Sequence, residues 1–254
     1  MKCAPLGSLR QNLYSVARLE WKKKLNLLLC IASDLQIIHS QNLIHRDLHS
    51  GNILQDNLYS AYIADLGLSI SANIALEKEG VYGVLPYIAP EVLCGNPCVV
   101  ESDIYSFSII MWEIFSGKAV PFKHSSYSIR TQFQIQVCSG SRPPIMEGTP
   151  QRYIDLMEKC WDGNPENRPS AKKIYEIFTE WQNDEKILLE LTESNKILKN
   201  TETYSEAVYK SEFIPYTNQL SYQGKYFCRT TNFFIFIEIN IINIVNIILY
   251  FTIL

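Results

Sequence analysis

The sequence has no excess of positive charge, and this absence excludes one large class of proteins. Its 254 residues include 23 Lys and Arg and 26 Asp and Glu, so the net charge is −3 at pH 7. Nucleic-acid-binding domains normally carry a basic excess or a basic stripe. Glycine and proline are also few, at 11 each, which argues against collagen-like and low-complexity chains. We therefore expect a folded protein that does not bind nucleic acid.

The chain also has few metal-binding side chains and no secretory signal. It contains 4 His and 7 scattered Cys. Cys94 and Cys98 are the only close pair, and no second pair is present to complete a zinc site. The N-terminus lacks the apolar stretch of a signal peptide. We expect free thiols in a reducing compartment, which places the protein in the cytoplasm.

Hydrophobic periodicity predicts several helices. Residues 20–40 carry apolar side chains at steps of three and four, which fall on one helix face: Trp21, Leu25, Leu28, Ala32 and Leu35. We expect the adjacent basic run 22–24 to form a solvated turn. Residues 102–116 are apolar nearly all round and predict a central, buried helix that begins at Ser102 or Asp103 and ends at Gly117.

Shorter elements surround these two helices. We expect a turn at Gly7 followed by a helix capped by Ser8, and two amphipathic helices over 151–161 and 170–182. Residues 53–64 predict a β-hairpin with its turn at 55–57. Residues 65–91 read as a long loop, and loops of that length are usually functional. The predicted fold class is mainly α with a small β-hairpin.

Three side chains form the chemical constellation of the sequence. Asp47 lies in His-Arg-Asp, Asn52 follows five residues later, and Asp65 opens Asp-Leu-Gly. A carboxylate can accept a proton from a hydroxyl nucleophile. Amide and carboxylate oxygens are suitable ligands for Mg²⁺. A base and two hard oxygen ligands around one metal suit phosphoryl transfer, where catalysis depends on positioning and charge neutralisation.

The order of the motifs is more specific than any one of them. HRDLHSGN at 45–52 is followed by ADLG at 64–67, Ala-Pro-Glu at 89–91, SDIYSF at 102–107, Cys-Trp at 160–161 and NPENRP at 164–169. This series resembles the C-terminal half of the protein kinase catalytic domain. Its last motifs look most like the tyrosine-kinase-like branch. The resemblance implies a protein-kinase-like fold in which residues 1–182 form the C-terminal helical lobe, from hinge to last helix.

The resemblance also implies roles for individual residues. Asp47 would be the catalytic base, supported by His45, Arg46, His49 and Asp103. Nucleotide binding would involve Ala4, Leu54, Asn52 and Asp65, of which Asn52 and Asp65 would ligate Mg²⁺. Glu91 and Arg168 would form a buried ion pair. The candidate phosphorylation sites of the activation segment are Ser69, Ser71 and Tyr82.

Three positions depart from the family pattern. His49 stands where serine/threonine kinases usually carry a lysine that contacts the transferring phosphate. Val84 stands where a threonine often bridges to the base, and Leu66 replaces the phenylalanine of Asp-Phe-Gly. The first two changes leave open whether the acceptor hydroxyl belongs to Ser, Thr or Tyr.

The N-terminal lobe of a kinase is not visible in this sequence. Only 44 residues precede His45, and none of them forms a G-x-G-x-x-G loop. That lobe would supply the phosphate-covering loop and the lysine that holds the α- and β-phosphates. We therefore expect weak binding of ATP and Mg²⁺ and little or no activity from this chain as written.

The C-terminal region differs in character. Residues 183–223 are polar and are expected to be partly helical or disordered, whereas 233–254 are almost wholly apolar. That run is long enough to cross a bilayer as a C-terminal tail anchor with the kinase part in the cytosol. Translated intron sequence is an alternative for 224–254, because Gly224-Lys225-Tyr226 can be encoded by a splice-donor string. A buried strand pair is the third interpretation.

Two hypotheses for function follow. The first is a protein kinase that transfers the γ-phosphate of ATP to a hydroxyl of a protein substrate. The second is a binding or scaffold module that uses the substrate-docking face without catalysis. Such a module could also be tethered to a membrane through 233–254. Asp47, Asn52 and Asp65 are all intact, and this favours the first hypothesis.

Overall fold

The computed structural model describes residues 4–71, 80–122, 127–194, 211–217, 221–222, 225–230 and 233–238; for the last three ranges the description covers the backbone. The helices are α1 (Leu9–Ala17), α2 (Trp21–Ser40), α3 (Pro90–Leu93), α4 (Val100–Ser116), α5 (Tyr127–Cys138), α6 (Gln151–Cys160), α7 (Ala171–Asn183) and α8 (Glu185–Ser194). The strands are β1 (Leu43–Ile44), β2 (Ile53–Asn57), β3 (Ser60–Ile63), β4 (Ile70–Ser71), β5 (Gly80–Gly83), β6 (Glu212–Pro215), β7 (Ser221–Tyr222), β8 (Lys225–Thr230) and β9 (Phe233–Glu238).

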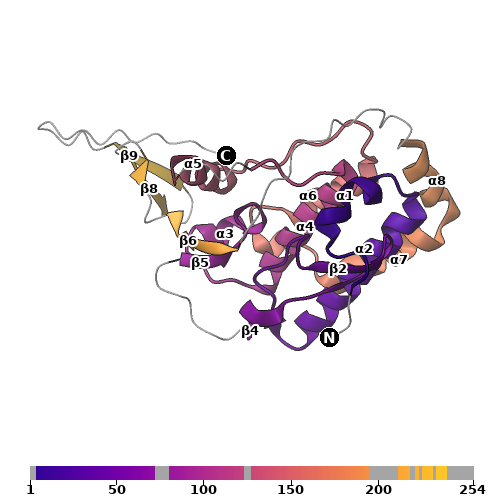
Figure 1. The fold of residues 1–254 in the computed structure, drawn as a ribbon. Coiled ribbons are helices and arrows are strands. Elements are labelled where there is room, and N and C mark those ends of the chain that lie inside the picture. Colours follow the sequence, from indigo (N-terminus) through magenta and orange to yellow (C-terminus); the bar gives the residue numbers. More distant parts are fainter. Residues whose placement is uncertain are drawn as a thin grey trace, which may run out of the picture.

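Helix α4 forms the centre of the helical lobe, as its apolar sequence predicts. Nearly every side chain from Ser102 to Ser116 is buried, and α1 and α6 pack against it. Helices α2 and α7 lie side by side on one flank, while α5 lies on the opposite flank near β5 and β6 (Figure 1). The Trp21 ring meets Tyr153 edge-on at 5.2 Å, and this contact ties α2 to α6. The predicted class, mainly helical with short antiparallel strands, is confirmed.

Helix α2 confirms the predicted apolar face but corrects the prediction for the basic run. Lys22 and Lys23 are exposed, as expected of a solvated segment. The Lys24 side chain, however, is completely buried, with Nζ 5.2 Å from the Trp21 ring and 5.5 Å from the Phe115 ring. Lys24 shares its helix face with Trp21 and Leu28, since residues three and four apart are neighbours on a helix. The burial of Lys24 was missed because its two preceding lysines suggested that the whole run is exposed to solvent.

The helix ends agree with the sequence except at the start of α4. Gly7 has φ +69°, and Ser8 precedes α1, where its backbone N–H donates to the Gln11 side chain at 2.9 Å. Gly117, with φ +73°, ends α4. The predicted N-cap of α4 is wrong, because Val99 occupies that position and Ser102 lies inside the first turn, accepting the Val99 N–H at 3.2 Å.

The predicted hairpin is present as β2 and β3. These strands pair antiparallel with Ile53 opposite Ile63, and the turn lies at Leu58 and Tyr59, directly after the predicted position 55–57. The turn was misplaced because Gln55 and Asp56, although polar, are strand residues. Segment 6–8 lies along the other edge of β2: Leu6 N–H donates to Gln55 O at 3.2 Å, and Gln55 N–H donates to Gly7 O at 2.9 Å.

The predicted loop 65–91 contains short ordered elements in its described parts. Strand β4 pairs with β1, β5 pairs with β6, and α3 begins at Pro90. Helix α5 was not predicted, because its alternation of polar and apolar residues gives a weak helical pattern.

The C-terminal region contributes both helix and strand. Helix α8 covers the predicted extension up to Ser194, with the backbone broken at Asp184. Strands β7, β8 and β9 form an antiparallel sheet, so the apolar run begins as strand over 233–238, and 239–254 lie outside the described residues. Within the described ranges, the structure contains no helix with the length and apolarity to cross a bilayer.

Candidate active site

The loop that carries Asp47 is held in place by Asp103 from α4. The two carboxylate oxygens of Asp103 accept the backbone N–H groups of His45 at 2.8 Å and Arg46 at 3.0 Å. His39 from α2 lies 2.9 Å from the same carboxylate. Arg46 has φ +71°, a left-handed conformation that these two hydrogen bonds fix. Asp103 therefore shapes the loop backbone, the role that the family resemblance implies.

His45 connects this loop to the segment that carries Asp65. Its Nε2 lies 3.1 Å from Ala64 O, and its Nδ1 accepts the Asp47 N–H at 3.3 Å. The accepting Nδ1 places the ring hydrogen on Nε2, from where it donates to Ala64 O. His45 is fully buried, and its two contacts join the loop of Asp47 to the segment that leads into Asp65.

The Asp47 side chain is buried, with 6% of its surface exposed. Its Oδ2 accepts a hydrogen bond of 2.6 Å from Ser211 Oγ and lies 3.7 Å from His49 Nε2. Burial by itself would raise the pKa of Asp47, but the contacts with His49 and Ser211 and the potential of both histidines lower it. Asp47 is therefore ionised at neutral pH and can accept a proton.

The His49 ring turns its Nε2 toward this carboxylate, at 3.7 Å from Asp47 Oδ2. Its Nδ1 accepts the Gly51 N–H at 3.0 Å, so the hydrogen of the neutral ring lies on Nε2, on the side of Asp47. Arg10 approaches the same Nδ1 at 3.4 Å. The imidazole thus lies beside the base, where the sequence placed it, and it offers one directed donor.

Asn52 and Asp65 are brought to the same side of the loop. The side-chain amide nitrogen of Asn52 donates to the backbone oxygen of Asp47 at 2.9 Å. The backbone oxygen of Asn52 accepts the Ala64 N–H at 2.8 Å. Asp65, next in sequence, has φ +63°; its exposed carboxylate accepts the Gly67 N–H at 3.2 Å.

This donor set fits a hard cation. The Asn52 amide nitrogen is engaged with the loop, which leaves its side-chain oxygen as a potential ligand, and Asp65 offers an exposed carboxylate on the adjoining segment. Mg²⁺ is typically held by one or two such oxygen ligands together with water and phosphate oxygens. In the described part of the chain there is no group of three or more His, Cys, Asp and Glu side chains that could form a protein-only metal cage.

Two further residues predicted to bind the nucleotide, Ala4 and Leu54, lie on neighbouring segments of the chain. Ala4 O accepts the Gly7 N–H at 3.1 Å in the turn before α1, and Ser8 pairs with Leu54 of β2. Ala4 and Leu54 are both half-buried. Segment 4–8 and β2 therefore form one edge beside the loop of Asp47.

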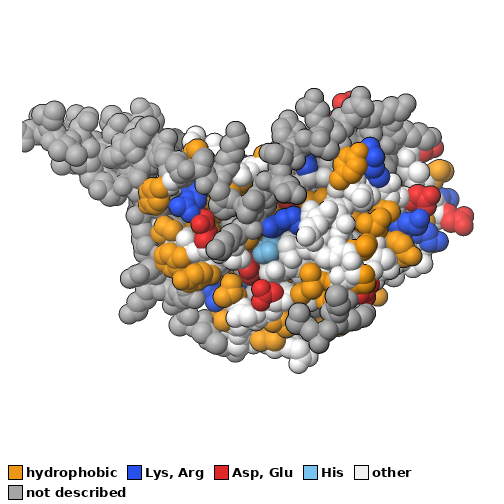
Figure 2. Space-filling model, in the orientation of Figure 1, with side chains coloured by type: hydrophobic (Ala, Val, Ile, Leu, Met, Phe, Trp, Pro, Cys, Tyr) orange, Lys and Arg blue, Asp and Glu red, His pale blue; other side chains and the backbone are white. Residues whose placement is uncertain are grey.

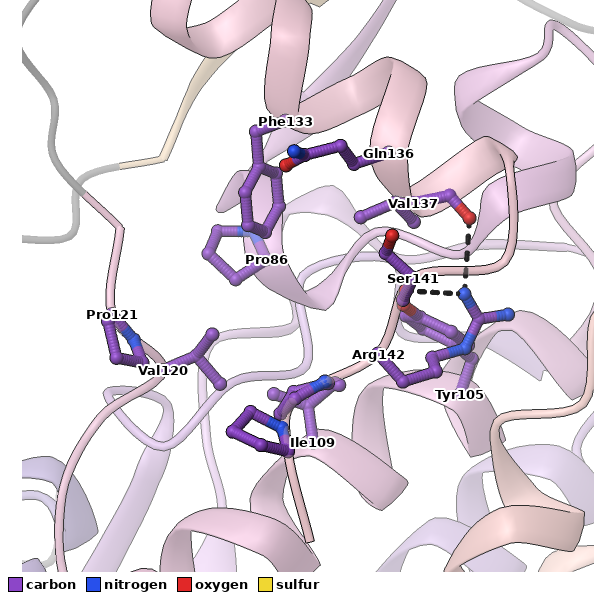
Figure 3. A pocket seen from close by; sticks show the side chains of 12 residues that line it. Pro86, Tyr105, Ile109, Val120, Pro121, Phe133, Gln136, Val137, Ser141 and Arg142 are labelled. Atoms are coloured by element: carbon purple, nitrogen blue, oxygen red, sulfur yellow. Dashed lines mark hydrogen bonds between the residues drawn. The ribbon is translucent and has the colours of Figure 1, made fainter.

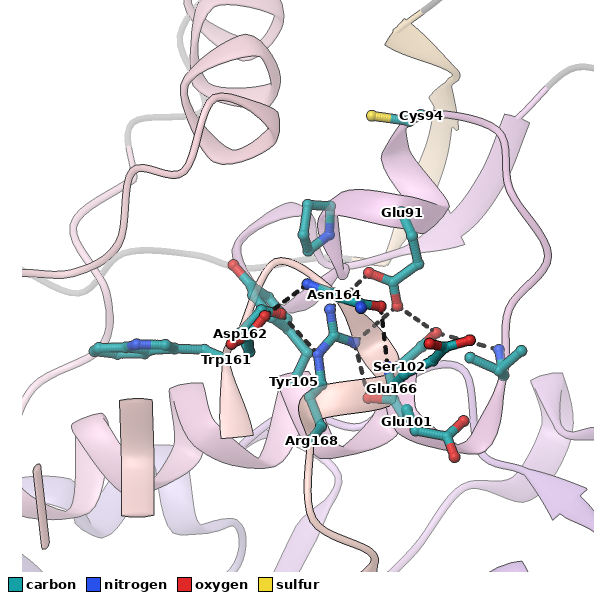
Figure 4. A network of polar contacts seen from close by, with 12 residues as sticks. Glu91, Cys94, Glu101, Ser102, Tyr105, Trp161, Asp162, Asn164, Glu166 and Arg168 are labelled. Carbon is teal, nitrogen blue, oxygen red and sulfur yellow. Dashed lines mark hydrogen bonds and ion pairs between the residues drawn. The ribbon is translucent and has the colours of Figure 1, made fainter. Parts of the chain in front are cut away.

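The predicted ion pair between Glu91 and Arg168 is present and buried (Figure 4). The guanidinium binds both carboxylate oxygens, at 2.8 and 2.7 Å, and also donates to the backbone oxygens of Glu101 and Asp162. Ser102 donates to the same carboxylate at 2.8 Å. This network joins α3, at the end of the activation segment, to α4 and to the segment before α7.

The three predicted phosphorylation sites have different surroundings. Ser69 donates to His45 O at 3.4 Å, and Ser71 lies in β4 opposite Leu43. Tyr82 in β5 is the most exposed of the three, at 47%, and its ring packs against Phe213 at 5.4 Å. The side chain at position 84 is a buried valine, which has no hydroxyl to reach the base.

Two features near the base were not predicted. The first is a buried polar network in which Tyr87 donates to Glu113 at 2.6 Å and also contacts Ser50 and Arg10. A lone glutamate inside the apolar run of α4 was the signal for it. The second is Ser211, which lies in a region expected to be a polar tail, and no local pattern could place it beside Asp47.

An apolar cavity lies away from the loop of Asp47. It is bounded by α4, α5 and the loop 141–144, with Phe133 and Pro86 on one side and Arg142 on another (Figure 3). None of the predicted site residues lines it. The chemistry is therefore concentrated at the loop of Asp47 rather than in this cavity.

Comparison with known proteins agrees with the motif series. Residues 1–178 match the family described as protein tyrosine and serine/threonine kinase. The chain belongs to the protein kinase family. Members of this family transfer phosphate from ATP with the help of Mg²⁺ and act on protein substrates.

Several relatives of this kinase chain are eukaryotic. A probable serine/threonine-protein kinase of Dictyostelium discoideum is 34% identical over 191 residues, covering 66% of this chain and 12% of the relative. A probable LIM domain-containing serine/threonine-protein kinase of the same organism is 34% identical over 169 residues, covering 66% and 25%. The serine/threonine/tyrosine-protein kinase HT1 of Arabidopsis thaliana is 30% identical over 175 residues, covering 69% and 44%. The chain spans less than half the length of these relatives.

Proposed function

We propose that this chain carries the catalytic loop and metal ligands of a protein kinase that phosphorylates protein hydroxyl groups. Residues 1–182 would form the kinase lobe. The observation that carries the proposal is the environment of Asp47: an ionised carboxylate, held by a fixed loop, with a hydroxyl group 2.6 Å from its Oδ2. A general base must lie within hydrogen-bonding distance of the proton that it accepts.

In the proposed reaction, the acceptor oxygen forms a bond to the γ-phosphorus while the bond to the β–γ bridging oxygen breaks. ADP leaves, and the proton of the hydroxyl passes to Asp47. Asn52 and Asp65 would hold Mg²⁺, which neutralises phosphate charge when it is bound. His49 Nε2–H would orient Asp47 or donate to a phosphate oxygen.

The test is transfer of labelled phosphate from Mg-ATP to three peptide acceptors that carry Ser, Thr or Tyr. We expect the signal to fall at least about 100-fold in Asp47→Asn, the scale associated with general-base catalysis. The matched control is Asp155→Asn, an exposed aspartate on α6 outside the site. The unchanged chain should give only the weak signal that its sequence predicts. Transfer that survives Asp47→Asn would contradict the proposal, and no transfer above the Asp47→Asn background to any acceptor would contradict catalysis by this chain. The second result would favour the binding-module hypothesis.

For location, we propose the cytosol for the kinase lobe. Support comes from the cysteines of the described residues, none of which forms a disulfide bond: Cys30, Cys94, Cys98, Cys138 and Cys160. Cell fractionation tests the proposal. Recovery in a membrane pellet that resists carbonate extraction would instead favour the tail-anchor interpretation of 233–254.

A further inference from the structure

A segment from the C-terminal region lies against the candidate active site as an added strand. Strand β6 pairs antiparallel with β5, with Glu212 opposite Gly83, Phe213 opposite Tyr82 and Ile214 opposite Val81. In Figure 1, β6 lies next to β5 and α3, below α5, although it is far from all three in sequence. Backbone pairing with an exposed strand is a common way for proteins to bind extended peptides.

The residue before β6 places a hydroxyl group at the base. Ser211 Oγ donates to Asp47 Oδ2 at 2.6 Å. This is the distance at which a general base contacts the hydroxyl that it activates. The strand pairing therefore fixes the register in which the Ser211 hydroxyl meets Asp47.

Side chains of the segment hold it on both sides of the strand. Glu212 forms two hydrogen bonds of 2.8 Å with Arg130 of α5, and both partners are partly exposed. Ile214 is 4% exposed, and Thr217 donates to Leu93 O of α3 at 2.9 Å. Gln134 of α5 donates to Pro215 O at 3.0 Å.

Apolar side chains complete the contact. The Phe213 ring packs edge-on against Tyr82, and Tyr216 is 6% exposed. On the described surface, hydrophobic side chains gather over β5, β6 and α3 (Figure 2). The segment therefore makes backbone, ionic and apolar contacts with the surface formed by β5, α3 and α5.

We infer that residues 211–217 occupy, in cis, the groove that binds the acceptor peptide, and that they block it. This inference rests on the proposed kinase function, because it takes Asp47 as the base. It also defines the peptide class: an extended strand with the acceptor serine first, an acidic residue next and a buried apolar residue at the third position after the serine. A tethered strand competes strongly with free peptides because its effective concentration is about millimolar.

The first experiment measures backbone amide exchange in residues 80–83 of the full chain. Ile214→Asp places a charge at a buried position and should detach the strand, so exchange should become about tenfold faster or more. Glu212→Arg tests the same point without changing the buried residue. Glu190→Arg is the matched control, because it alters a different Arg–Glu pair, the one with Arg152 on α6.

Peptide rescue tests whether the groove recognises the sequence. A synthetic peptide of residues 209–219 should restore slow exchange in Ile214→Asp, and a scrambled peptide of the same composition should not. Unchanged exchange in both strand variants, or equal rescue by the scrambled peptide, would overturn the inference.

A catalytic measurement separates this inference from the proposed function. If the chain shows Asp47-dependent transfer, Ile214→Asp should raise the rate on a separate peptide several-fold. Equal rates for Ile214→Asp and the unchanged chain would overturn the inference that the strand blocks the groove. Stoichiometric phosphate on Ser211 of the unchanged chain would also overturn it. If the exchange results hold while no transfer is detected, the proposed function fails and the cis-bound strand stands.

Discussion

Tyr87 donates a 2.6 Å hydrogen bond to Glu113, and both side chains are buried beneath the loop of Asp47. Ser50 and Arg10 extend this contact toward His49. Burial raises the pKa of Glu113 to about 7, although the hydrogen bonds from its neighbours act in the opposite direction. The network therefore holds a carboxyl group that titrates near neutral pH inside the lobe.

Glu113→Gln should change how stability depends on pH. Below pH 4.5 the carboxyl is protonated in both the folded and unfolded states. Between 4.5 and about 7 only the folded state keeps the proton, so wild-type stability falls as pH rises. The loss should approach about 3 kcal/mol, and the variant should not show it. Urea denaturation from pH 5 to 8 measures this, with Glu158→Gln on the exposed side of α6 as control.

Lys24→Met should stabilise the protein at neutral pH. Burial lowers the pKa of Lys24 from 10.5 to about 8, so the charged amine is disfavoured in the folded state. Stability rises between pH 8 and 10.5, where only the unfolded state binds the extra proton. We expect a gain of roughly 2–3 kcal/mol at pH 7 that fades toward pH 10.5. Thermal denaturation of Lys23→Met, an exposed neighbour, should show no comparable gain.

Arg168→Met should destabilise the lobe by about 3–5 kcal/mol, because it leaves the buried Glu91 carboxylate without its cation. The double variant with Glu91→Gln should recover part of this loss. The comparison is Arg152→Met, which breaks the exposed pair with Glu190 and should change the free energy of unfolding by about 1 kcal/mol or less. Similar losses in Arg168→Met and Arg152→Met would contradict the structural role assigned to the buried pair.

Asp103→Asn should loosen the loop of Asp47. Both carboxylate oxygens accept backbone N–H groups, and an amide offers only one acceptor. We expect a loss of about 1–3 kcal/mol for the unsatisfied group, with faster amide exchange confined to His45 and Arg46. Asp155→Asn serves again as the surface control. Exchange that increases equally throughout α4 would show that Asp103 supports the helix rather than the loop.

The sequence was most informative where side-chain pattern and local chemistry coincide. The apolar run of α4 and the i, i+3, i+4 spacing of α2 predicted buried helices, and both are present. The hairpin followed from two short apolar runs. Each of these elements is stabilised by apolar contacts on the face that its own hydrophobic periodicity predicts.

The errors arise where the deciding contact is distant in sequence. Lys24 is buried by Phe115, which no pattern around position 24 reveals. The cap of α4 was expected at Ser102 or Asp103 and lies at Val99, whereas Asp103 binds the backbone of His45 and Arg46, as expected of a residue that supports the loop. The position of Ser211 is fixed by its hydrogen bond to Asp47, whereas the sequence around Ser211 resembles a polar tail. Tertiary contacts of this kind override local propensity.

The strand at the active site has a consequence for the order of folding. Ser211 and Asp47 are 164 positions apart, so the helical lobe can form before this pair closes, since distant contacts form late. A strand held mainly by its own short set of contacts also opens in a smaller step than the whole lobe. Access to Asp47 is then governed by a local opening equilibrium. Mutations in the helical core can change global stability without changing how often the site is open.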